Sequence, residues 1–200
     1  MSPRRAAVLR DGGDRSLRDH LIATAERMIS EQGTAGLTVR GIAREAGVAD
    51  GVLYNHFTDK EELLAHALRA HVRTVEQGLS ALPRPGAGTV AGNLRDYIAY
   101  GLEMHRVILP AMAGLLGRPE VLARFATANE PGEDYRDRLL GYLRAERELG
   151  RLAPGARVES ATAMIVGVCH ETVLTLLFGG APPEPNVDDL VATLLDGLSP

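Results

Sequence analysis

The stretch of residues 38–60 constrains the fold of this chain more than any other part of the sequence. Ile42, Ala43 and Ala46 recur at helical spacing, which predicts a short helix with one buried stripe. Gly47 follows at the position where helices end in a left-handed residue, a conformation that glycine adopts at little cost. The pattern predicts two short helices joined by a tight turn. Such a helix-turn-helix has a second helix that fits the major groove of DNA.

The second helix predicted in this stretch has an apolar side and a polar side. Val52, Leu53 and Phe57 supply the apolar residues. The outward side is a polar set with a small residue near the helix start, namely Asp50, Gly51, Tyr54, Asn55 and His56. We therefore expect this side to remain exposed while the other side packs on the neighbouring helices.

The run AGVADGVLYNHFTDKEELL resembles the signature of the TetR family (tetracycline-repressor-like transcriptional regulators), whose usual form is close to AGVSxGxLYxxFxxKEEL. The resemblance is specific over residues 17–71, and beyond them it is one of length and helical layout. It implies an all-α chain with an N-terminal three-helix DNA-binding domain and a C-terminal helical domain for ligand binding and dimerisation. The boundaries we expect are a disordered arm at 1–15, a DNA-binding domain at 16–75 with its motif at 38–57, and an effector-binding and dimerisation domain at 76–200.

The resemblance also assigns DNA-binding roles to single residues. Tyr54 and His56 match positions whose side chains hydrogen-bond phosphate oxygens. Lys60, the only lysine of the chain, matches a residue that grips a phosphate together with the start of its helix. Gly51 lets the backbone approach the duplex closely. The full expected DNA-binding set is Thr38, Arg40, Ala49, Asp50, Gly51, Tyr54, Asn55, His56 and Lys60.

The sequence leaves the role of several of these residues open. Thr38 should cap its helix, whereas Gly41 stands where the family has an acid and weakens that helix by up to about 1 kcal/mol relative to alanine. Arg40 contacts a phosphate, a base edge, or solvent alone. Ala49 replaces a serine that usually caps the second helix, so Asp50 either takes over the cap or accepts a hydrogen bond from a cytosine amino group. Asn55 is a candidate for a groove contact.

Composition excludes several classes of protein. Two hundred residues with 45% hydrophobic content suffice for one large or two small folded domains without stabilising disulfides or metal ions. A single cysteine, Cys169, excludes an internal disulfide framework and fits a reducing compartment. No signal peptide is recognisable at the N-terminus, so we expect a cytoplasmic location. The first 75 residues hold eleven Lys and Arg against ten Asp and Glu, so DNA affinity must come from local placement of cations.

Around the motif, the sequence predicts two further helices in the first domain. Ser16 opens the first by a capping box, and Gly33 ends it. Upstream, the arginines of residues 1–15 either form an arm in the minor groove or belong to a disordered tail. Thr58 and Asp59, followed by two glutamates, give overlapping capping boxes for a helix that runs to about Leu82.

The remainder reads as helices separated by Pro and Gly, with no strand pattern. We expect helices at 89–106, 111–117, 119–129, 133–152, 158–178 and 187–198, with a kink or a restart of the chain at Leu109-Pro110. The helix at 158–178 is apolar nearly all round, and burial rather than a membrane explains it because His170 and Glu171 interrupt it. The resemblance suggests a homodimer through 158–178 and 187–198.

The resemblance places an apolar effector pocket among the remaining helices. Its candidate lining is Tyr97, Tyr100, Met104, His105, Met112, Phe125, Met164 and His170. A stripe of Met and aromatic residues is equally the pattern of an ordinary core. Glycines at 101, 114, 141 and 167 either leave room for a ligand or allow close helix packing.

Together these patterns predict a ligand-responsive repressor that binds a palindromic operator as a homodimer, with an unidentified small molecule relieving binding. The alternative is a small-molecule-binding or adaptor protein whose helix-turn-helix grips DNA weakly or not at all. No catalytic, cofactor or metal signature is present: His170-Glu171 begins like HExxH, but Leu174 stands at the fifth position. An enzyme is therefore not expected.

Overall fold

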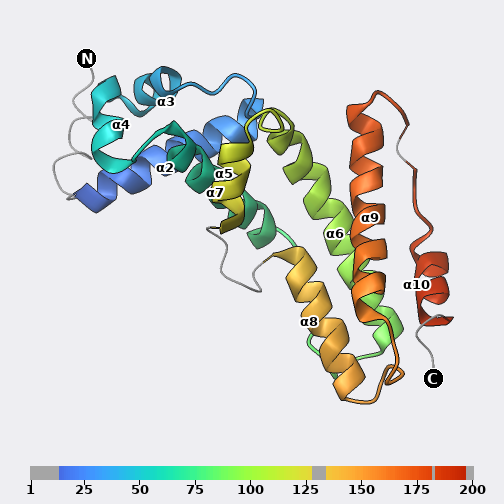
Figure 1. Ribbon diagram of the computed structural model, residues 1–200. Coiled ribbons are helices and arrows are strands. Elements are labelled where there is room, and N and C mark those ends of the chain that lie inside the picture. The colour runs from blue at the N-terminus through green and yellow to red at the C-terminus, as the bar shows by residue number, and fades with distance from the viewer. Residues whose placement is uncertain (1–13, 128–133, 182, 197–200) are drawn as a thin grey trace. The chain divides into compact units, whose positions relative to one another are not determined.

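The computed structural model describes residues 14–127, 134–181 and 183–196. Every regular element in these ranges is a helix, which confirms the all-α prediction (Figure 1). The helices are α2 (Asp14–Gln32), α3 (Val39–Ala46), α4 (Asp50–His56), α5 (Lys60–Gln77), α6 (Val90–Ala113), α7 (Pro119–Thr127), α8 (Tyr135–Glu148), α9 (Val158–Leu177) and α10 (Val187–Asp196).

The chain forms two compact units, and the second is not the continuous stretch 76–200 that the sequence suggested. The head unit contains Met1–Glu76 together with Pro110–Ala128, and the bundle unit contains Gln77–Leu109 and Asn129–Pro200. Residues 110–128 join the head because Ala111, Leu115 and Val121 are buried in its core. The predicted arm at 1–15 lies outside the described residues except for the backbone of its last two, which are helical.

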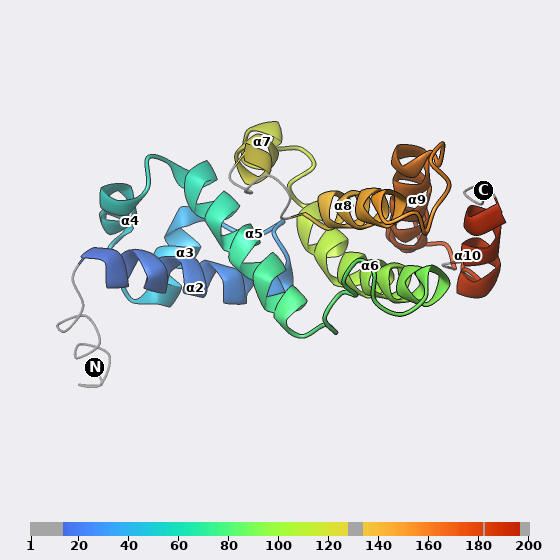
Figure 2. The same ribbon diagram turned by 90° about the horizontal axis from the view of Figure 1, so that it is seen from below.

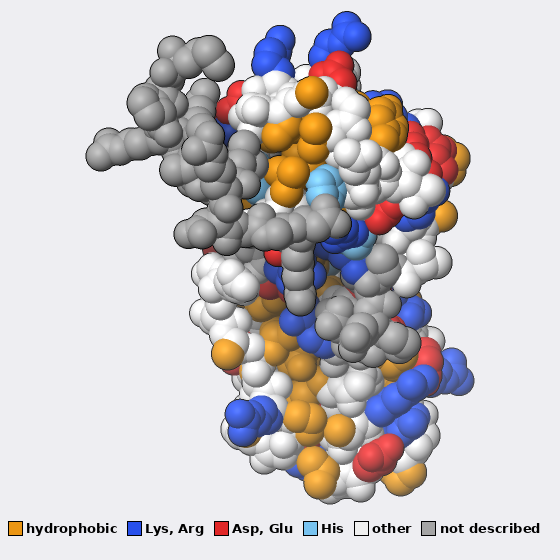
Figure 3. Space-filling view, turned by 90° about the vertical axis from the view of Figure 1, so that its left-hand side faces the viewer, with side chains coloured by type: hydrophobic (Ala, Val, Ile, Leu, Met, Phe, Trp, Pro, Cys, Tyr) orange, Lys and Arg blue, Asp and Glu red, His pale blue; other side chains and the backbone are white. Residues whose placement is uncertain are grey.

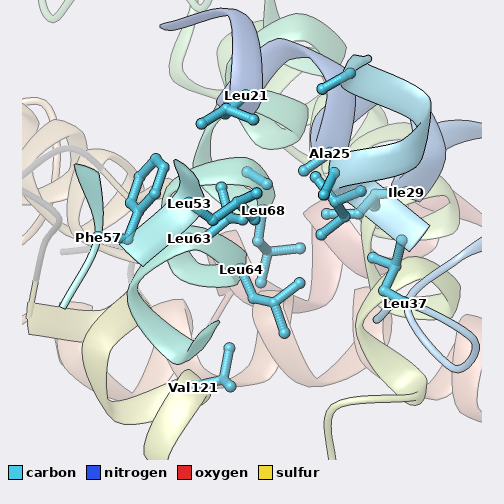
Figure 4. Packing of buried hydrophobic residues seen from close by; sticks show 14 of the residues in the cluster. Leu21, Ala25, Ile29, Leu37, Leu53, Phe57, Leu63, Leu64, Leu68 and Val121 are labelled. Atoms are coloured by element: carbon cyan, nitrogen blue, oxygen red, sulfur yellow. The ribbon is translucent and has the colours of Figure 1, made fainter. Parts of the chain in front are cut away.

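The core of the head unit is made by apolar faces of α2, α3, α4, α5 and α7. Leu21, Ala25 and Ile29 recur along α2 at helical spacing and are at most 1% exposed. They meet leucines of α5 and α4 in the interior, and Val121 of α7 lies against the same cluster (Figure 4). α5 runs across α2 within this unit (Figure 2). The packing fixes the side of α4 that remains outside.

The start of α2 and the end of α5 differ from the sequence prediction, whereas the end of α2 agrees with it. α2 already includes Asp14, the first described residue, and so extends upstream of the predicted start at Ser16. Gly33 ends α2 as expected, with φ 69°. α5 ends at Gln77 rather than Leu82, because Gly78 is a poor helix residue and Pro83 disfavours helical backbone at the position before it.

Of the two alternatives predicted at Leu109-Pro110, the restart is wrong. Pro110 lies inside α6, which continues to Ala113, and the expected separate helix at 111–117 is absent from the described residues. Proline removes one backbone donor here, but Arg106 and Pro110 are both exposed, so water can satisfy the freed carbonyl of Arg106. Gly114 then packs so tightly that a Cβ atom would lie 2.5 Å from the backbone N of Ala35.

In the bundle unit, α6 packs with α8 and α9 (Figure 1). Leu94, Ile98, Leu139, Leu143 and Ile165 are fully buried between them. α8 is shorter than the predicted 133–152, and α10 is described to Asp196, so the last two residues of its predicted range lie outside the described residues.

One glycine of the bundle unit is there for close packing. A Cβ atom on Gly101 would lie 2.5 Å from the Tyr135 hydroxyl and 2.9 Å from Cys169 Sγ. Among the four glycines singled out in the sequence, Gly101 and Gly114 therefore allow close packing. Gly141 and Gly167 have nothing within 4 Å of the added atom.

The single chain does not bury α9 on all sides. By length and composition alone, the helix could cross a membrane. In its most apolar 18-residue stretch, 33% of the residues are buried. Met164 is 60% exposed and Phe178, directly after the helix, is 86% exposed. One face of α9 packs inside the bundle unit, and the opposite face carries apolar side chains that this unit leaves uncovered.

Candidate nucleic-acid interface

The helix-turn-helix is built by local interactions that the sequence specifies. Thr38 caps α3, because its Oγ1 accepts a hydrogen bond of 3.0 Å from the backbone N–H of Gly41. Gly47 ends α3 with φ 74°, and its N–H bonds to carbonyls of the last turn. Leu53 and Phe57 are buried and hold α4 against the core. The outer side of α4 is thereby presented to solvent.

The structure places every predicted DNA-binding residue outside the core. Tyr54 is 60% exposed, so most of its side chain faces solvent. Of the remainder, His56 and Lys60 are half-buried, and the others are exposed, namely Thr38, Arg40, Ala49, Asp50, Gly51 and Asn55. Gly51 has nothing within 4 Å of an added Cβ atom, so the backbone at the start of α4 is open to close approach.

Asp50 does not cap α4. Ala49 is the N-cap residue, and no side chain makes the capping hydrogen bond. The Asp50 carboxylate instead accepts a hydrogen bond of 3.1 Å from Nε of Arg40 on α3. One ion pair therefore joins the exposed surfaces of the two helices of the motif.

The start of α5 is held by contacts from two directions. Asp59 caps α5 by accepting a hydrogen bond of 2.9 Å from the Glu62 N–H, and Glu62 in turn accepts from the Thr58 N–H, as the capping boxes predicted. Arg124 of α7 donates to both carboxylate oxygens of Asp59 at 2.6 Å. These contacts lower the pKa of Asp59, with the backbone hydrogen bond from Glu62 as the largest cause.

Lys60 lies next to this cap. Burial lowers the pKa of its ammonium group, and the like charge of Arg118 lowers it further. Arg118 and Arg124 therefore belong to the surroundings of the predicted phosphate site, and sequence reasoning missed both. No local pattern could have found them, because Arg124 is separated from Asp59 by 65 residues.

The charge of the interface is mixed. Both Lys and Arg and Asp and Glu side chains occur on the face shown in Figure 3. Two exposed arginines of the head unit are also paired with acids: Arg27 with Glu31 and Glu45, and Arg40 with Asp50. Attraction to DNA must therefore come from individually placed groups.

The predicted effector-binding residues are not all brought together. Tyr97, Tyr100, Met104 and His105 are buried in the bundle unit. Met112 and Phe125 instead pack against the core of the head unit. Met164 is 60% exposed on α9, and His170 lines an open hollow of about 570 Å³ with Leu174 and Phe178. The bundle unit thus keeps five of the eight near its interior, and the ligand site itself remains a prediction.

Polar groups gather inside the bundle unit around His105. Its Nδ1–H donates a hydrogen bond of 2.6 Å to the Gly101 carbonyl, and its ring meets the edge of His170 at 4.8 Å between centroids. Tyr135 stacks edge-on to His105 and donates to the Tyr97 carbonyl. Burial lowers the pKa of both histidines and raises the pKa of the Cys169 thiol to about 11. The cluster is therefore neutral at pH 7.

We expect the bundle unit to lose stability as the pH falls from 7.5 to 5.5. In the unfolded chain, a histidine takes up a proton near pH 6.5, whereas His105 and His170 stay neutral in the fold until a lower pH. Each histidine then costs at most about 1.4 kcal/mol per pH unit within that window. Thermal unfolding followed by tyrosine fluorescence measures this, because four of the five tyrosines lie in the bundle unit.

A His105→Gln, His170→Gln variant should flatten this pH dependence. The matched control is His66→Gln, since His66 also has a pKa lowered by burial but lies in the head unit. An equal slope in the double variant and in the wild type would contradict the prediction.

Comparison with known proteins agrees with this geometry. The family model described as bacterial regulatory proteins of the tetR family matches residues 21–67. The HTH-type transcriptional regulator BetI of Stenotrophomonas maltophilia is 34% identical over 122 residues, covering 56% of this chain and 61% of that protein. The HTH-type transcriptional repressor KstR2 of Rhodococcus jostii is 25% identical and covers 94% and 93%.

Solved structures share the fold over both units. The flavonoid-responsive regulator FrrA has a TM-score of 0.63 at 23% identity, covering 90% of this chain and 93% of FrrA. The TetR family transcription regulator SCO0332 has a TM-score of 0.62 at 24% identity, covering 92% and 99%. At these identities the likeness is one of fold.

An exposed helix-turn-helix followed by an all-helical second unit defines the class of two-unit, helix-turn-helix proteins. Over residues 21–67, the head unit of this chain belongs to the TetR family of bacterial regulatory proteins. The match to BetI spans 61% of that relative, and the match to KstR2 of Mycolicibacterium smegmatis spans 26% of its length.

Proposed function

We propose that this protein is a DNA-binding transcriptional repressor that acts in the cytoplasm as a homodimer on a palindromic operator, and that a small apolar effector relieves binding. The observation that supports the proposal most is the outward polar side of α4, where Tyr54 is 60% exposed and the space around Gly51 is open. A tyrosine that serves packing alone would be covered. The relatives named above are regulators or repressors.

The roles at the interface follow from chemistry and position. Tyr54 and His56 on α4 donate to phosphate oxygens, and Lys60 grips a phosphate at the start of α5. Thr38 lies at the exposed start of α3, where the first backbone N–H groups have no carbonyl partner within the helix. Asn55, exposed on α4, is available to a base edge in the major groove.

The homodimer is supported by the uncovered face of α9. Met164, Leu174 and Phe178 recur at helical spacing on one stripe and are each at least 43% exposed. Gly167 lies on the same stripe, and the space around it would let a second helix approach closely. Pairing through α9 and α10 of two chains covers this stripe and gives the two recognition helices that a palindrome requires, about 34 Å apart.

An apolar effector is supported by the interior of the bundle unit. Tyr100, Met104, His105 and His170 combine aromatic and sulfur-containing surface with imidazole groups that can orient a ligand. Related folds bind varied molecules: FadR of Bacillus subtilis is known in complex with stearoyl-CoA, and the multidrug binding protein EbrR in complex with imidazole. No metal or cofactor is part of the proposal.

A mobility-shift assay on DNA flanking the gene for this protein tests the proposal. We expect Tyr54→Phe to lower affinity about tenfold, because each of two protomers loses one hydrogen bond of about 0.7 kcal/mol. Lys60→Ala should lower the slope of log affinity against log salt by about two, one phosphate contact per protomer. Glu120→Ala, an exposed change at the start of α7, is the control. Unchanged binding in both test variants would contradict the phosphate assignments.

The alternative remains an adaptor or small-molecule-binding protein with weak DNA binding. The observation in its favour is the mixed charge of the interface, with Arg40 engaged by Asp50. The two functions differ in salt dependence: specific DNA binding loses affinity steeply between 50 and 200 mM salt, roughly a thousandfold or more for six phosphate contacts. A chain that binds an effector but no DNA at low salt would support the alternative.

A further inference from the structure

The ion pair between Arg40 of α3 and Asp50 of α4 bears on which DNA bases the protein recognises, a question separate from the phosphate contacts described above. We propose that Arg40 and Asp50 together read one G·C base pair in each half-site of the operator, with Asp50 positioning the guanidinium group of Arg40. The inference rests on the proposed DNA-binding function and deepens it. Under this proposal, the carboxylate of Asp50 takes part in base recognition rather than only repelling DNA phosphates.

The geometry of the pair is the first step. Arg40 Nε donates to Asp50 Oδ2 at 3.1 Å, and the two side chains are 87% and 50% exposed. Arg40 is in the first turn of α3 and Asp50 in the first turn of α4. Because residues at the start of a recognition helix contact base edges, the bond holds the guanidinium beside the part of the motif that reads sequence.

Asp50 has no other structural task that would explain its charge there. The N-terminus of α4 lacks a side-chain cap even though Asp50 is one residue away, so the carboxylate is engaged by Arg40 and not by the backbone. An isolated carboxylate at a DNA-facing surface would repel phosphates. Neutralised by a guanidinium, it can be accommodated in the groove.

The donors and acceptors that remain match a G·C pair. A guanidinium has five N–H groups, and the bond to Asp50 uses the one on Nε. The two Nη atoms remain able to donate side by side to O6 and N7 of guanine. Asp50 retains Oδ1 as an acceptor, and the cytosine of the same pair presents an N4 amino donor in the major groove. An A·T pair offers an adenine amino donor where the arginine needs an acceptor.

A phosphate contact for Arg40 fits the same geometry less well. The ion pair has no net charge, so its attraction to a phosphate is largely cancelled at a distance. Recognition of guanine depends on the planar arrangement of donors, which the carboxylate fixes rather than weakens. Arg44, exposed in the last turn of α3, is a neighbouring cation that forms no ion pair with an acid in the described part of the chain.

Selection from a random DNA library with the full chain supplies the test, because it needs no known operator. The wild type should enrich a palindrome with one G·C pair in each half that tolerates replacement poorly, by about tenfold to a hundredfold. Arg40→Lys keeps the charge but lacks the planar fork, so it should lose that preference while binding other positions as before. Asp50→Asn should weaken the same preference and steepen the salt dependence, since each protomer becomes more positive by one charge.

The matched control is Glu45→Gln. It removes the acid of another exposed ion pair, Arg27–Glu45 at 2.6 Å, which joins α2 to α3. This variant should enrich the wild-type sequence. Retention of the G·C preference by Arg40→Lys, with wild-type binding intact, would overturn the inference alone. A wild-type chain that enriches no sequence would overturn the proposed function itself and the inference with it.

Discussion

Replacing Met164 and Phe178 by glutamate is expected to convert the protein into a monomer and to lower its affinity for a palindromic operator at least about a hundredfold. The two side chains lie on one stripe of α9 and its C-cap, 60% and 86% exposed. In a two-fold dimer each residue occurs twice. The loss of four apolar side chains from an interface, each worth about 1.5–3 kcal/mol when fully buried, exceeds what a typical homodimer can tolerate.

The fold of the single chain should survive this change. Both residues are largely exposed, so their replacement leaves the core of the bundle unit intact, and far-UV circular dichroism should be unaltered. Sedimentation equilibrium measures the mass, and a mobility shift with full and half operators measures the affinity. Val107→Glu, which changes an apolar residue 46% exposed on α6, is the matched control. A double variant that still sediments as a dimer would refute pairing through α9.

Glu146→Ala should lower the free energy of unfolding of the bundle unit by about 3 kcal/mol. Glu146 is fully buried on α8. Its Oε1 accepts a hydrogen bond of 3.1 Å from the Gly86 N–H, and its Oε2 lies 3.2 Å from Nε of Arg151. Arg151 in turn donates to the Gly88 carbonyl at 2.7 Å. Without the Glu146 carboxylate, the guanidinium of Arg151 and the N–H of Gly86 lose the acceptor that they share.

Urea unfolding followed by tyrosine fluorescence measures this effect, since Tyr97, Tyr100, Tyr135 and Tyr142 all belong to the bundle unit. Glu146→Gln keeps an acceptor oxygen and should cost less than the alanine change. Glu148→Ala, two residues along the same helix and exposed, should be within about 0.5 kcal/mol of the wild type. Equal loss of stability in the Glu146→Ala and Glu148→Ala variants would show that the buried carboxylate has no such role.

Predictions from the sequence succeeded where the cause was local. The cap at Thr38, the left-handed residue at Gly47 and the capping of α5 by Asp59 and Glu62 all involve residues at most five positions apart. Their geometry follows from hydrogen bonds that a helix end needs wherever it lies. The same reasoning correctly left Tyr54 outside the core, because the helical period fixed which side of α4 is apolar.

Predictions failed where propensity competed with packing. The chain was expected to kink or restart at Leu109-Pro110. Instead, α6 continues through Pro110 to Ala113, because the neighbouring residues Ala111 and Leu115 are buried in the core of the head unit. Met112 and Phe125 were expected among the residues that line an effector pocket. Both lie against the head unit, because a stretch of 19 residues between the two parts of the bundle unit belongs to the other core.

The sequence by itself determined the helix-turn-helix, its exposed polar side and the all-helical class, since helical periods and caps are set by neighbours along the chain. Only the tertiary structure decided that Arg40 engages Asp50, that Arg124 holds the cap of α5 from 65 residues away, and that one apolar face of α9 stays uncovered. Each of these depends on which helices meet in space, and contacts between distant segments leave no mark in a local pattern.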